Sequence, residues 1–140
     1  MPIQNQPSVV FTMAHHHASK AISAYGAGIN HTPNLDCIVN DGMLFNHCYA
    51  TDSICTPSRA AILTGTHNHV NLVMTLNSEI NERLPNVAKS LQAGGYQTGM
   101  VGKWHLGEGK GHEPIGFDYW NVVPGQLVNT TALRLLSRRA

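Results

Sequence analysis

Residues Cys55–Gly65 read CTPSRAAILTG, and the rest of the chain is organised around this stretch. Thr56 can act as an N-cap, and Pro57 suits the first helical position because its missing N–H would have no helical partner there. The run of alanine, isoleucine and leucine that follows favours a helix, and Gly65 can end it in a left-handed conformation. The pattern predicts a helix that begins directly after Cys55, so that this side chain faces the positive end of the helix dipole.

Two side chains of this stretch can take part in chemistry. Cys55 is a potential nucleophile, and Arg59, one helical turn further on, can donate two N–H bonds to a tetrahedral oxyanion. The same residues also fit a simpler alternative, in which a helix happens to follow a buried cysteine.

The full string resembles the signature of the type I sulfatases, in which a cysteine followed by x-Pro-Ser-Arg is oxidised to formylglycine. Every defined position of that signature is present, namely Cys55, Pro57, Ser58, Arg59, Leu63, Thr64 and Gly65. The resemblance implies a sulfatase (a sulfuric ester hydrolase) that cleaves small-molecule or carbohydrate sulfate esters, with Cys55 modified by a formylglycine-generating enzyme. A hydrated aldehyde carries two hydroxyls, one to attack the ester and one to expel sulfate, which divides one hard step into two easier ones.

A second motif stands at Gly102–Gly107 (GKWHLG), after residues 96–101, which are predicted to form a parallel strand. If the strand continues, Lys103 and His105 alternate onto the same side. An ammonium suits a sulfate oxygen, and a histidine suits proton transfer near neutral pH, although Lys-x-His alone would equally suit a solvated loop. This motif also resembles one of the sulfatase family, which implies that both side chains contact the sulfate and the formylglycine hydroxyl. The predicted catalytic residues are Cys55, Arg59, Lys103 and His105.

The amino-terminal part of the chain carries a candidate metal site. Residues 8–13 (SVVFTM) are predicted to form a first buried parallel strand that leads into three consecutive histidines, and ligands gather beyond the carboxyl ends of such strands. The sulfatase family has two aspartates and a histidine here, so the resemblance implies that His15, His16 and Cys55 belong to a calcium or magnesium site. Ca²⁺ requires oxygen ligands, so imidazoles in place of both carboxylates fit it poorly, whereas Zn²⁺ tolerates them.

Further elements follow from local patterns in the chain. Helices are predicted over residues 33–41, ending at Gly42, and over residues 85–93, ending at Gly94. Residues 43–49 are predicted to form a strand. Cys37 and Cys48 are expected to be small buried hydrophobes, and His67 and His69 to lie in a polar loop.

These elements predict an α/β fold, namely the amino-terminal part of a doubly wound, mostly parallel sheet flanked by helices. The resemblance implies an alkaline-phosphatase/sulfatase-like fold that is truncated here, because sulfatases are well over twice as long as these 140 residues. We expect a partial sulfatase amino-terminal domain over residues 1–126 and an unmatched basic tail over residues 127–140. For this tail a frame disruption, an artificial end and a terminal helix all remain open.

Composition limits the partners and the cellular location. The net charge is +1, so no electrostatic argument favours nucleic acid or a membrane surface as a partner. The amino terminus shows no signal peptide, and the 3 cysteines do not suggest a disulfide framework, which favours a cytoplasmic location. A periplasmic or secreted protein is expected instead if the amino terminus is incomplete.

Two alternatives to an active enzyme follow from the histidines. His15 and His16 in place of carboxylates also fit a catalytically inactive sulfatase remnant. The 9 histidines outnumber the 8 acidic residues, which also fits a His-rich metal-binding fragment without hydrolysis.

Overall fold

The computed structural model describes residues 6–125 and 136–138, and side chains only within residues 6–125. The chain divides into two compact units, Met1–Cys48 and Tyr49–Ala140. Within the described residues, no helix is long and apolar enough to cross a lipid bilayer.

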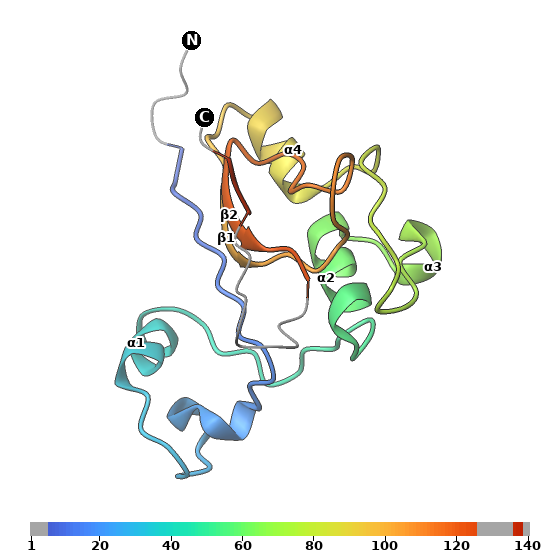
Figure 1. Cartoon of the computed structure of the whole chain (residues 1–140). Coiled ribbons are helices and arrows are strands. Elements are labelled where there is room, and N and C mark those ends of the chain that lie inside the picture. Colours follow the sequence, from blue (N-terminus) through green and yellow to red (C-terminus); the bar gives the residue numbers. More distant parts are fainter. Residues whose placement is uncertain (1–5, 126–135, 139–140) are drawn as a thin grey trace. The chain divides into compact units, whose positions relative to one another are not determined.

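The first unit contains the short 3-10 helices η1 (Ser19–Ala21) and η2 (Ser23–Tyr25) and the helix α1 (Pro33–Asp41) (Figure 1). The predicted helix over residues 33–41 is confirmed, because proline at its start and Gly42 after its end are local signals. Polar side chains join η2 to α1: the Ser23 hydroxyl donates to Asp36 at 2.6 Å, and the Thr32 hydroxyl accepts from the Ser23 amide at 2.9 Å.

The two strands predicted in and next to this unit are wrong. Residues 8–13 and 43–49 contain no strand, and Val10 and Phe11 are 87% and 71% exposed. A strand is stable only against a neighbouring strand, and the described residues 6–48 contain none. Cys37 and Cys48 are exposed rather than buried, because no described residue of this unit is buried and they have no core to enter.

The second unit is a small α/β structure. It contains α2 (Cys55–Thr64), α3 (Asn68–Asn71), α4 (Val87–Ala93) and the strands β1 (Gly99–Lys103), β2 (Tyr119–Val123) and β3 (Leu136–Arg138) (Figure 1). The strands lie in the order β1-β2-β3; β1 and β2 are parallel with Gly99 opposite Tyr119, and β3 is antiparallel to β2. The parallel orientation of β1 agrees with the predicted sheet, but its partner β2 was not among the predicted strands.

The core of this unit lies on one face of the sheet. It consists of the buried residues Ala60, Val73, Ile80, Trp104, Leu106, Trp120 and Val122. Trp120 and Val122 point to the core because alternate residues of a strand share a face, whereas Val101 of the neighbouring strand is 75% exposed.

Two predicted boundaries shift in this unit. The helix predicted over residues 85–93 is α4, and it begins at Val87 because Asn86 caps it. The Asn86 side-chain oxygen accepts from the Lys89 amide at 2.9 Å. The predicted strand over residues 96–101 begins at Gly99 and runs to Lys103. Within the expected tail, Leu136–Arg138 form a strand, and residues 127–135 and 139–140 lie outside the described residues.

Candidate active site

Cys55 is the first residue of α2, and the cap precedes it. The N-cap is Ile54, with extended backbone angles, so the predicted cap at Thr56 is wrong. Thr56 lies inside the first turn, fully buried, and its hydroxyl donates to the Leu76 carbonyl at 3.2 Å. The end of the helix is as predicted, because Gly65 adopts φ +67° and its amide donates to the Ala61 carbonyl at 2.8 Å.

The structure brings Cys55, Arg59 and Lys103 together. The Lys103 side chain hydrogen-bonds to the Cys55 side chain. One turn into α2, Arg59 donates through Nη1 to the Lys103 carbonyl at 2.6 Å, so it ties the helix to the end of β1. The end of the parallel strand and the beginning of the helix thereby place two cationic side chains at residue 55.

Burial lowers the pKa of both cationic side chains, Arg59 and Lys103, whereas the negative charge of a Cys55 thiolate would raise it. Burial lowers the pKa of Arg59, and the thiolate raises that pKa by a smaller amount. The pKa of Lys103 is also lowered, first by burial and then by the charge of Arg59, while Cys55 raises it. Two partly desolvated cations beside one small side chain favour an anion at this point.

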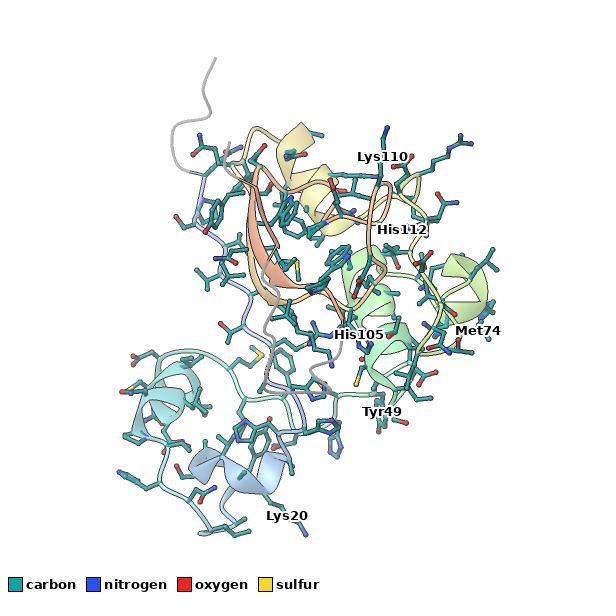
Figure 2. The ribbon with its side chains drawn as sticks, in the orientation of Figure 1. Lys20, Tyr49, Met74, His105, Lys110 and His112 are labelled. Atoms are coloured by element: carbon teal, nitrogen blue, oxygen red, sulfur yellow. The ribbon has the colours of Figure 1, made fainter. Side chains whose placement is uncertain are left out.

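His105 lies two residues beyond Lys103, but not through a continued strand as predicted. β1 ends at Lys103, and His105 has a left-handed backbone with φ +54°. Its amide donates to the Pro124 carbonyl at 2.7 Å, which fixes the turn. Figure 2 labels the His105 side chain. The residue borders a cavity of about 210 Å³ that Glu79 and Glu108 also line. The reason for expecting His105 on the same side as Lys103 is therefore wrong, and its part in the site stays a prediction.

His15 and His16 lie in the first unit, whereas Cys55 lies in the second, so the three-residue metal set stays a prediction. Both imidazoles are exposed, and their ring centroids are 4.0 Å apart. A pair of nitrogen donors does not fit Ca²⁺ or Mg²⁺, which are bound through oxygen. The expected strand before them is absent from the described residues, so their position does not follow from a strand end.

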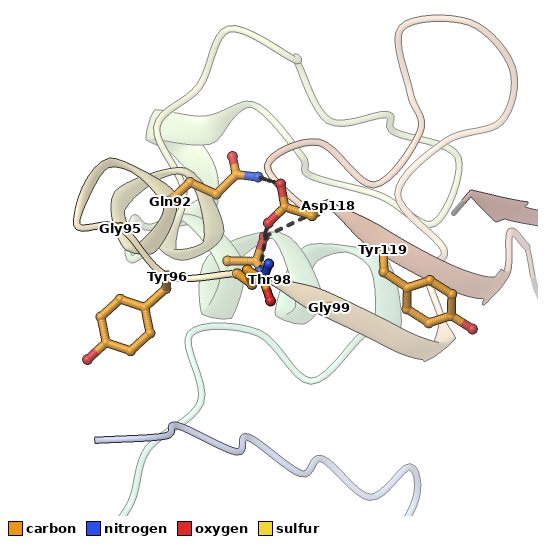
Figure 3. A pocket seen from close by; sticks show the side chains of 8 residues that line it. Gln92, Gly95, Tyr96, Thr98, Gly99, Asp118 and Tyr119 are labelled. Atoms are coloured by element: carbon orange, nitrogen blue, oxygen red, sulfur yellow. Dashed lines mark hydrogen bonds between the residues drawn. The ribbon is translucent and has the colours of Figure 1, made fainter. Parts of the chain in front are cut away.

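A hollow of the second unit lies at the opposite end of β1. Its volume is about 600 Å³, and Tyr96 and Tyr119 flank it (Figure 3). The Asp118 carboxylate accepts from the Gln92 side-chain amide at 2.7 Å and from the Thr98 backbone amide at 2.8 Å, so these polar groups satisfy one another. Residues at the start of the sheet and at the end of α4 line this hollow, and none of the predicted site residues is among them.

Two buried asparagines near the site were missed by the sequence reasoning. His67 and His69 were expected in a polar loop, but Asn68–Asn71 form the short helix α3, and Asn68 and Asn71 are 8% and 2% exposed. Two asparagines three residues apart share one face of a helical turn, and that spacing is the signal that could have indicated them.

Comparison with known proteins identifies the family. A family model described as sulfatase matches residues 7–125. The chain belongs to the sulfatase family. It is 43% identical over 121 residues to an N-acetylglucosamine-6-O-sulfatase of Bacteroides thetaiotaomicron, covering 86% of this chain and 21% of that sulfatase. An N-acetylgalactosamine-6-O-sulfatase of the same organism is 35% identical over 136 residues, covering 85% of this chain and 27% of that sulfatase.

Solved sulfatase structures match the fold as well. One of them, described as a complex with its substrate D-glucosamine-2-N,6-O-disulfate, has a TM-score of 0.81 and 43% identity, covering 87% of this chain and 24% of that sulfatase. The predicted family and the α/β fold of the sulfatases are thus confirmed. The chain spans about a fifth to a quarter of the length of the curated sulfatases named above.

Proposed function

We propose that this sulfatase-family chain serves sulfuric ester hydrolysis, with residue 55 as the reacting position. The observation that carries the proposal is the contact among three residues from two sulfatase motifs. The Lys103 side chain hydrogen-bonds to Cys55, and Arg59 is held one turn further along the same helix. A helix N-terminus with two cations beside it favours a tetrahedral dianion such as sulfate.

Each residue has a distinct part in the proposed reaction. Formylglycine made from Cys55 would supply the hydroxyl nucleophile. Lys103, which already contacts position 55, binds a sulfate oxygen and stabilises negative charge as the S–O bond breaks. Arg59 has Nη1 committed to the Lys103 carbonyl, so it orients the lysine backbone and leaves its other N–H groups for the anion. His105 gives a proton to the departing alcohol oxygen.

The residues at positions 15 and 16 do not supply the ligands of a calcium or magnesium ion, so no step is assigned to such an ion. His15 and His16 are exposed and offer nitrogen donors. The substrate is proposed as a sulfate ester of a carbohydrate, because the names of the relatives and the complex of the solved sulfatase all describe sulfated amino sugars.

Peptide mass spectrometry tests the proposal. The chain is produced together with a formylglycine-generating enzyme, and the peptide that contains residue 55 is analysed for the aldehyde. We expect conversion of Cys55 and no conversion of the exposed Cys48, with Cys55→Ser as the control. Unmodified cysteine at position 55 in every preparation would contradict the mechanism. Hydrolysis of an aryl sulfate, lost in Lys103→Met, would then establish activity.

A second function is favoured by the two neighbouring imidazoles. The ring centroids of His15 and His16 lie 4.0 Å apart, and imidazoles select Zn²⁺ or Ni²⁺ over Ca²⁺. In this alternative the chain is a metal-binding family member without hydrolysis. Calorimetry should then show Zn²⁺ binding that His15→Ala and His16→Ala weaken, whereas His31→Ala leaves it unchanged. Equal Zn²⁺ binding in all variants would exclude this alternative.

A further inference from the structure

The first turn of α2 begins at Cys55 and leads to Arg59, yet no capping side chain holds it. The N-cap, Ile54, has no side-chain group that could accept a bond from the first amides. Among the described backbone bonds, the Ser58 amide donates to the Ile54 carbonyl at 3.0 Å. First turns without a side-chain cap fray easily, so the position of this turn must depend on contacts from outside the helix.

Asn68 of α3 provides such a contact. Its Nδ2 donates to the Pro57 carbonyl, in the first turn of α2, at 2.8 Å and to the Val73 carbonyl at 2.9 Å. The two N–H groups of the amide thus join two separate segments, and Asn68 is only 8% exposed. A buried donor with both protons bonded has one orientation, so it fixes the distance between the segments that it joins.

Asn71, at the other end of α3, makes comparable hydrogen bonds. Its Nδ2 donates to the Thr66 carbonyl at 3.1 Å, and its oxygen accepts from the Val73 amide at 2.9 Å. Asn71 is 2% exposed and lies on the same short helix as Asn68. The two residues therefore share type, burial and element. Asn68 bonds to the first turn of α2, whereas Asn71 bonds to the Thr64 hydroxyl at the end of α2 at 3.5 Å and to the Thr66 carbonyl beyond it.

We propose that Asn68 is a positioning residue of the sulfatase site, which holds the first turn of α2 and thereby sets where residue 55 and Arg59 lie. This inference rests on the proposed function, since the site that it positions is the one assigned above. Asn68 acts through Pro57 and the helix backbone, and it makes no contact with Cys55, Arg59 or Lys103 among the described hydrogen bonds.

Amide hydrogen exchange in the full chain, followed by NMR, tests the proposal. In Asn68→Ala, exchange of the Ser58 amide should accelerate roughly tenfold or more, because the first turn loses the buried hydrogen bond from the Asn68 side chain to the Pro57 carbonyl, while the Gly65 amide changes several-fold less. Asn71→Ala should give the opposite order, because its bonds lie next to Gly65. The Arg59 side-chain Nε signal should shift in Asn68→Ala and not in Asn71→Ala, which a general loss of stability would not produce.

Equal acceleration of both amides in the two variants would overturn the proposal, as would an unchanged Ser58 amide in Asn68→Ala. If Asn68→Ala does not fold, Asn68→Ser keeps one hydroxyl donor and is subjected to the same comparison. None of these measurements depends on an aldehyde at position 55 or on ester hydrolysis. Failure of the proposed function and failure of the positioning role are therefore distinguishable.

Discussion

At the scale of single residues, Lys103 makes stability depend on pH. Burial lowers its pKa from 10.5, so at pH values between the lowered pKa and 10.5 the folded chain binds fewer protons at this lysine than the unfolded chain. The free energy of unfolding should therefore rise with pH across this window, and Lys103→Met should make that rise smaller. Urea unfolding from neutral pH to about pH 10 measures the difference, with Lys110→Met correcting for the loss of one positive charge. Parallel curves for wild type and Lys103→Met would contradict the assignment.

The residues of the candidate site could be named from the sequence, but their contacts only in part. Cys55, Arg59 and Lys103 lie within two short motifs, and the structure brings them together although 44 residues separate Arg59 from Lys103. His105 was expected by strand alternation, which fails because the strand ends and the backbone turns left-handed. The spacing of Asn68 and Asn71 could have indicated a shared helical face, but their role could not be read, because the partners of Asn68 are the carbonyls of Pro57 and Val73, which carry no sequence signal.

At the scale of elements, three helices were predictable, whereas α3 was expected to be a loop and two of the expected strands are absent from the described residues. The helices α1, α2 and α4 all end at a glycine that the sequence displays, and this signal is local. The strands expected over residues 8–13 and 43–49 depended on distant neighbours that local patterning cannot supply. β1 was found from its own local pattern, whereas its partner β2, 20 residues further along the chain, was not predicted as a strand.

The cap of α4 allows a prediction about this element. Asn86 is 5% exposed; its oxygen accepts from the Lys89 amide at 2.9 Å, and its Nδ2 donates to the Ile115 carbonyl at 3.1 Å. Asn86→Asp keeps the acceptor and loses the donor, whereas Asn86→Ala loses both. We expect Asn86→Ala to lower the free energy of unfolding by about 1–2 kcal/mol through the lost cap alone. Helicity and urea unfolding should rank wild type above both variants, and an unchanged Asn86→Ala would contradict the capping role.

At the scale of the whole molecule, the two units differ in how much they bury. The second unit has a core around Trp104 and Trp120, whereas none of the described residues 6–48 is buried. Local opening costs little where few apolar groups leave water, so the first unit should exchange its amides much faster than the second. Hydrogen exchange with peptide mass spectrometry should show peptides from residues 6–48 fully exchanged while those around β1 and α2 remain protected. Equal protection of both units would mean that a stabilising contact, such as a metal held by the histidines, contributes more to the first unit than its apolar burial does.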